Sequence, residues 1–227
     1  MKIIHFELFV FISLLFPSPL HAQGIVKGRV VFEGTPPAAE KVEVQSDTAT
    51  CGTEKEIRRM ILGEGQGVAG AVVKILGAAG SSAPREGTLD QVSCEFVPHL
   101  QALPLNSTLK ITSSDPVLHN SHGFFEDGST AFNIAVPIAG MELTTKLDKP
   151  GIIKLRCDAG HTWMSAYVVV PDEAHFAVTG ENGNFSLEGV PPGSYEIEVW
   201  QEWLGKTKQP VEVKEGETEV TIILKNP

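Results

Sequence analysis

A cysteine, a histidine and a methionine lie within eight residues of one another in the stretch RCDAGHTWMSAYVVV, residues 156 to 170. These residues are Cys157, His161 and Met164, in the spacing Cys-x3-His-x2-Met. A thiolate, an imidazole and a thioether are together suited to a soft metal ion. The alternative is a chance meeting of three residue types that are often buried, just before a buried strand.

A copper ion that changes between the cuprous and cupric states needs one thiolate and two imidazoles in a near-trigonal plane, with a weak axial thioether. The second imidazole must come from the segment SSDPVLHNSHGF, which holds His119 and His122. His119 is preferred because it follows the predicted strand STLKITSS and precedes Asn120. An amide at that place can hydrogen-bond to the cysteine-bearing loop and fix it. His122 remains the alternative ligand.

The region from Gln91 to Val170 resembles the cupredoxin family, the blue-copper fold of plastocyanin, amicyanin and azurin. The resemblance rests on two segments, FVPHLQALPLNSTLKITSSDPVLHN and KPGIIKLRCDAGHTWMSAYVVV, which carry the ligand types in the family's order. It implies one mononuclear copper ion. The implied ligands are His119, Cys157, His161 and Met164.

Two positions bear on that resemblance. Asn106 stands where the family's turn usually has glycine, and Asn also accepts left-handed backbone angles. The ligand spacing also equals half of the binuclear copper loop of cytochrome oxidase, but Ile153 stands where that centre needs a second cysteine. A mononuclear site is therefore expected.

The N-terminal segment MKIIHFELFVFISLLFPSPLHAQ predicts a cleaved secretory signal, residues 1–22. It has Lys2, an apolar run from Phe9 to Phe16 and a small-residue ending at Ala22. The run is shorter than the roughly 20 apolar residues of a transmembrane helix. A retained N-terminal anchor is the alternative, since Glu7 offsets Lys2. We expect a secreted, periplasmic protein with no transmembrane segment.

The chain has three cysteines, an odd number for an exported protein. Cys51 and Cys94 have no ligand-type neighbours at metal-binding spacing, which favours a disulfide between them over two free buried thiols. Cys157 is then the unpaired thiol, at the position where the metal needs one.

Composition indicates an all-β protein. The 22 glycines and 15 prolines punctuate short runs rich in Val, Ile and Thr, and helical periodicity is hard to find. The formal charge is −10, and no cluster of Lys and Arg forms a patch for phosphates, which argues against nucleic acid as a partner.

Three parts follow the signal. Residues 23–75 hold β-strands that suit either neighbouring unit, and residues 76–170 form the cupredoxin-like copper domain, a Greek-key sandwich. Residues 171–227, through TGENGNFSLEGVPPGSYEIEVW, resemble the carboxypeptidase regulatory-like module, a small transthyretin-like β-sandwich without catalytic residues. The last strands are expected to form a hairpin around Glu215 and Gly216.

The ligand set favours a periplasmic electron-transfer protein that presents the exposed edge of His161 to a redox partner, such as a cytochrome or dehydrogenase. One alternative is a copper carrier or storage protein. Another is an envelope module that binds polysaccharide or protein, with a degenerate cupredoxin domain. An enzyme is not expected, because substrate chemistry normally needs an open coordination position. His99 and His175 are interpreted as structural or solvent-facing.

Overall fold

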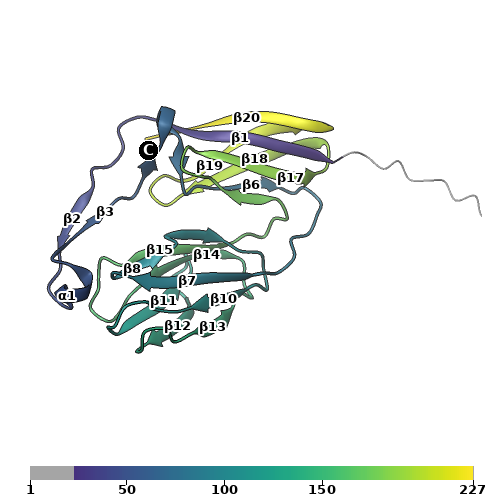
Figure 1. Ribbon diagram of the computed structural model, residues 1–227. Helices are drawn as coiled ribbons and strands as arrows, with labels where there is room; N and C mark the ends of the chain where they lie inside the picture. Colours follow the sequence, from purple (N-terminus) through teal and green to yellow (C-terminus); the bar gives the residue numbers. More distant parts are fainter. Residues whose placement is uncertain (1–22, 227) are drawn as a thin grey trace, which may run out of the picture.

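The computed structural model describes residues 23–226, so the predicted export signal lies outside the described residues. The described chain is all-β, as expected: its helical segments are α1 (Thr48–Cys51) and η1 (Glu64–Gln66). Two β-sandwiches lie one above the other (Figure 1). Across residues 23–226, no helix combines the length and the apolar character needed to span a bilayer.

The first unit, here called the terminal sandwich, combines strands from both ends of the described chain. Its strands are β1 (Gly24–Glu33), β6 (Val72–Leu76), β16 (Phe176–Val178), β17 (Asn184–Val190), β18 (Gly193–Gln201), β19 (Gly205–Val213) and β20 (Gly216–Lys225). One sheet has the order β17-β1-β20 and the other β16-β6-β18-β19. Alternate apolar residues, among them Val26, Ile197 and Ile222, fill the space between the sheets. β1 and β6, which precede residue 77, therefore pair with the C-terminal strands.

The expected hairpin around Glu215 and Gly216 is wrong. β19 pairs with β18, whereas β20 pairs with β1 in the other sheet. The turn at Gly216, with φ at 80°, thus carries the chain from one sheet to the other. An alternation of apolar and charged residues shows that one face of a strand is exposed to solvent. It does not identify the neighbouring strand with which that strand pairs.

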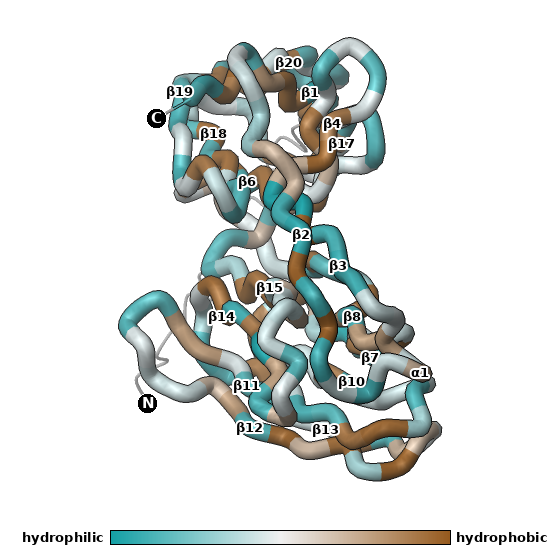
Figure 2. The backbone as a smooth tube through the Cα atoms, turned by 90° about the vertical axis from the view of Figure 1, so that its left-hand side faces the viewer, coloured by the Kyte–Doolittle hydropathy of each residue, from teal (hydrophilic) through white to brown (hydrophobic). Residues whose placement is uncertain are grey.

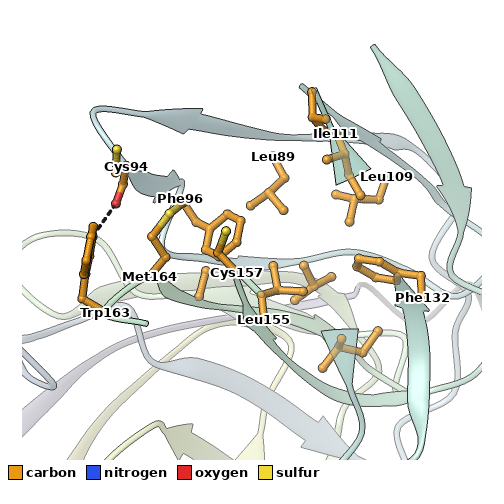
Figure 3. Packing of buried hydrophobic residues seen from close by; sticks show 14 of the residues in the cluster. Leu89, Cys94, Phe96, Leu109, Ile111, Phe132, Leu155, Cys157, Trp163 and Met164 are labelled. Atoms are coloured by element: carbon orange, nitrogen blue, oxygen red, sulfur yellow. Dashed lines mark hydrogen bonds between the residues drawn. The ribbon is translucent and has the colours of Figure 1, made fainter. Parts of the chain in front are cut away.

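The second unit, here called the central sandwich, is inserted between β6 and β16. Its strands are β7 (Glu86–Val92), β8 (Glu95–Val97), β9 (Leu100–Ala102), β10 (Thr108–Ile111), β11 (His119–Phe124), β12 (Thr130–Val136), β13 (Leu143–Lys146), β14 (Gly151–Arg156) and β15 (Ser165–Val170). The sheets have the orders β13-β10-β7-β8 and β12-β11-β14-β15-β9. Leu89, Leu109, Phe132 and Leu155 pack between them (Figure 3). Asn106 has the left-handed backbone expected of it, with φ at 64°.

The two sandwiches share an apolar junction. Val72 and Trp200 of the terminal sandwich pack against Ile152 and Val169 of the central one. The rings of Trp200 and Tyr167 meet edge to face, with centroids 5.1 Å apart. Burial of aromatic and aliphatic side chains at such a contact favours a fixed arrangement of the two units.

A segment of the terminal sandwich, residues 34–59, reaches over the central sandwich and is here called the strap. It leaves the end of β1, carries β2 (Glu40–Glu43), α1 and β3 (Glu54–Ile57), and returns to the short pair β4 (Ile61–Leu62) and β5 (Val68–Ala69). Figure 2 shows it running down from the upper unit to the lower one. Val44 and Cys51 of the strap are buried in the core of the central sandwich.

Candidate metal centre

Neighbouring strands bring the candidate ligands together. β11 begins at His119, and β14, which pairs antiparallel with β11, ends at Arg156 directly before Cys157. The loop that follows carries His161 and Met164 back into β15. Within this loop, the backbone N–H of Met164 donates to the carbonyl of His161 at 3.0 Å, which closes a tight turn.

Both imidazoles direct the same ring nitrogen at the cysteine sulfur. Nδ1 of His119 lies 3.9 Å from Sγ of Cys157, and Nδ1 of His161 lies 3.7 Å from it. Ligand atoms of all three residues lie within 4.8 Å of one another. Two atoms bound at about 2.0–2.3 Å to one ion with near-trigonal angles would be separated by roughly 3.7 Å. The donor set and its spacing therefore fit a single copper ion.

Met164 lies in the same buried region. Its side chain is 2% exposed, and Cys157 is 4% exposed. Both residues point into the core cluster, in which Phe96 is a neighbour (Figure 3). The structure thus gathers all four ligand types that the sequence pattern names at one end of the central sandwich.

Asn120 ties the two ligand segments to each other. Its backbone N–H donates to Sγ of Cys157 at 3.4 Å. Its side-chain Oδ1 accepts from the backbone N–H of Asp158 at 3.2 Å, which is the hydrogen bond across the loop expected of this amide. The sulfur is therefore held in place by groups that do not depend on a metal.

Asp115, which the sequence did not predict as part of the site, holds His119. Its Oδ2 lies 2.8 Å from Nε2 of His119, and the same carboxylate accepts from the backbone N–H groups of Ser93 and Cys94, at 2.7 Å each. Burial lowers the pKa of His119 from its ordinary value, although the Asp115 carboxylate opposes this shift. The ring is thus available in its neutral form, the form that binds metals.

Asp47 was likewise not predicted, and the expectation that His161 presents an exposed edge is wrong. His161 is 0% exposed. Its Nε2, the edge expected to face a redox partner, lies 2.9 Å from Oδ2 of Asp47 in the strap. The strap covers this edge because Asp47 contacts it directly and the nearby Cys51 is bonded to Cys94 of the central sandwich.

His122 lies away from the thiol. Residues alternate between the two faces of a strand, so His119 and His122 point to opposite sides of β11. His122 contacts Asp158 through Nδ1 at 2.6 Å and stacks on Phe124, with centroids 3.9 Å apart. Of the other histidines, His99 contacts Glu202 at 2.7 Å across the junction.

Cys51 and Cys94 form the expected disulfide, and Cys157 is the free cysteine of the described chain. The disulfide joins the strap to the turn between β7 and β8. Close to it, the indole N–H of Trp163 donates to the carbonyl of Cys94 at 3.0 Å (Figure 3). The strap is therefore bound covalently to the edge of the candidate metal centre.

Replacing both Cys51 and Cys94 by Ala is expected to lower the free energy of unfolding of the metal-free protein by about 4 kcal/mol, the loop-closure estimate for such a span. The two cysteines are 43 residues apart in sequence. Denaturant titration followed by circular dichroism measures the difference, and Cys157→Ala serves as the control that keeps the disulfide. Thiol counting on denatured wild-type protein should find one reactive thiol, and a count of three would contradict the pairing.

No family model and no curated protein matches the chain. Solved structures resemble part of it. A purple cupredoxin from Nitrosopumilus maritimus is 20% identical, covers 37% of this chain and 99% of its own, and has a TM-score of 0.33. A pseudoazurin from Sinorhizobium meliltoi is 22% identical, with coverages of 40% and 76% and a TM-score of 0.32. A copper-containing nitrite reductase from Thermus scotoductus is 20% identical, with coverages of 43% and 24% and a TM-score of 0.31. Scores this low assign no residue role to this chain.

Proposed function

We propose that this chain is an exported electron-transfer protein with one mononuclear copper site. His119, Cys157 and His161 would hold the ion, with Met164 as a further, weaker sulfur ligand. The observation that carries the proposal is the convergence of both Nδ1 atoms on the Cys157 sulfur, at 3.9 and 3.7 Å, with all three residues buried. A bound copper ion would supply one-electron transfer between its cuprous and cupric states.

The protein's own contribution is to keep the ligands in position. Asp115 and Asp47 hold the Nε2 atoms of the two imidazoles, and the N–H of Asn120 points at the thiol. Such partners fix the tautomer and orientation of a ligand histidine. A site held this way rearranges little when its charge changes, which suits electron transfer better than release of the metal. This favours an electron carrier over a copper carrier or storage protein.

Export to the periplasm is part of the proposal. It is supported by the signal-like sequence of residues 1–22 and by the Cys51–Cys94 disulfide, since disulfides persist in oxidising compartments. The partner would be a redox protein such as a cytochrome or dehydrogenase. We assign the terminal sandwich, with its resemblance to carboxypeptidase regulatory-like modules, the role of a scaffold that anchors both ends of the strap. Binding of polysaccharide or an envelope protein to it is the alternative.

Adding cupric ion to the purified mature protein tests this proposal. We expect one copper per chain and an intense thiolate-to-copper charge-transfer band in the visible spectrum. Voltammetry should then give a reversible one-electron wave. A colourless protein, or copper bound without the band, would refute the proposed site.

Met164→Leu is expected to keep both copper and colour and to raise the reduction potential. A thioether would be the weakest donor of the four, so its loss should leave the other three ligands in place, while a sulfur donor that helps to stabilise the cupric ion disappears. Voltammetry of the variant beside the wild type measures the change. If the variant loses copper altogether, the role of Met164 as a weak ligand is wrong.

A further inference from the structure

The strap is firmly attached at the point where it meets the candidate copper site. Its Cys51 is bonded to Cys94, and its Val44 is buried in the core of the central sandwich. Asp47 lies between these two residues. Its backbone carbonyl accepts from the N–H groups of Thr50 and Cys51, at 2.9 Å each, so the short α1 turn sets the direction of its side chain.

Within the described chain, the carboxylate of Asp47 does not stabilise the α1 turn that it precedes. Asp47 occupies the N-cap position of α1, but its side chain makes no capping hydrogen bond to that turn. The carboxylate meets the imidazole of His161, a residue 114 positions away in sequence, at 2.9 Å. Among residues 23–226, no other ion-pair partner of Asp47 is found. By contrast, Asp115 also holds the backbone of Ser93 and Cys94 and so has a structural role beside its contact with His119.

The orientation of the His161 ring indicates how its contact with Asp47 would affect a bound metal. Nδ1 of the ring faces the Cys157 sulfur, so Nε2 is the nitrogen that carries the proton when Nδ1 binds a metal. The ring then donates from Nε2 to the carboxylate of Asp47. A carboxylate in this place orients the imidazole and increases its donor strength. The stronger donor stabilises the cupric ion more than the cuprous ion, because the cupric ion has the higher charge.

The geometry points to Asp47 as a positioning residue through which the strap closes the copper site and favours its cupric state. This inference rests on the proposed copper function. It adds to that function a residue outside the central sandwich that controls the affinity and the reduction potential of the site. It also explains why His161 is fully buried: the strap replaces the solvent that would otherwise contact its outer edge.

Two substitutions test the role of Asp47 without straining the backbone. Asp47 has φ at 54°, a left-handed conformation that Asn and Gly accept readily. Asp47→Asn removes the charge and keeps an acceptor oxygen, while Asp47→Gly removes the acceptor as well. Glu43→Gln is the matched control, because it removes one negative charge from an exposed residue of the same strap.

We expect Asp47→Gly to lower the affinity for cupric ion roughly 10- to 100-fold. The affinity for cuprous ion should fall less, so the reduction potential rises, with Asp47→Asn between Asp47→Gly and the wild type. Glu43→Gln should match the wild type in both affinities. Competition titrations with chelators specific for each oxidation state, together with voltammetry, measure these quantities.

The outcomes separate this inference from the proposed function. If the wild type binds no copper, the proposed function fails and the role of Asp47 fails with it. If the wild type binds copper with the expected band while both Asp47 variants keep its affinities and potential, Asp47 alone is overturned. Circular dichroism and melting of the metal-free variants check the fold, and if Asp47→Gly does not fold, Asp47→Asn decides the question.

Discussion

Cys157→Ser is expected to abolish the visible charge-transfer band completely. The band belongs to the bond between sulfur and copper, and a serine hydroxyl is a hard donor that does not replace a thiolate. The substitution is close in size, and Cys157 is not part of the disulfide, so the fold should be retained. The spectrum after addition of cupric ion, recorded beside that of the wild type, measures the effect.

Met164→Leu is the matched control for this experiment, since it removes the other sulfur of the same loop and should keep the colour. Copper stoichiometry and the visible spectrum together distinguish two outcomes. A colourless variant that still binds some cupric ion agrees with the assigned role of Cys157. A variant that keeps the intense band would show that the colour arises elsewhere, and the candidate site would have to be abandoned.

His119→Ala is expected to reduce the affinity for cupric ion by more than about 100-fold, a larger loss than changes to the outer partners of a ligand produce. Its ring supplies one of the two nitrogens that face the thiol, and it is 0% exposed. Competition with a chelator of known affinity measures the loss. Added imidazole should restore part of the visible band, because a free ring can enter the space that the side chain leaves.

His122→Ala is the control, three residues further along β11. His122 faces the other side of the strand and contacts Asp158, not the thiol. This variant should therefore keep both the copper and the band. Loss of copper from His122→Ala together with its retention in His119→Ala would reverse the ligand assignment.

The grouping of the candidate ligands was predictable from the sequence because its signals are local. Cys157, His161 and Met164 share one loop, and the segment before His119 reads as a strand and a turn. The disulfide was also predictable, because counting the cysteines of an exported chain requires only the residue types and no knowledge of the geometry. For residues of this kind, the residue type and its position in a short motif are enough to predict a role.

The partners of the ligands were not predictable in the same way. Asp115 lies four residues before His119, but an Asp before a proline is also a common turn residue. Asp47 is 114 positions from His161, and no pattern in the sequence around it indicates that it approaches the candidate site. The hairpin wrongly predicted at Gly216 is a similar case. The strand that pairs with β20 is determined by contacts throughout the sandwich and not by the local sequence.

The parallel pairing of β1 with β20 has a consequence for biosynthesis. All ten residues of β1, from Gly24 to Glu33, pair with β20, and the whole central sandwich lies between these strands in sequence. During translation, β1 therefore has no β20 to pair with until the segments that carry the candidate ligands have been synthesised. Pairings between strands so far apart in sequence form slowly. We therefore expect the end of β1, from which the strap leaves, to be fixed later in folding than local strand pairs of the central sandwich such as β11 with β12.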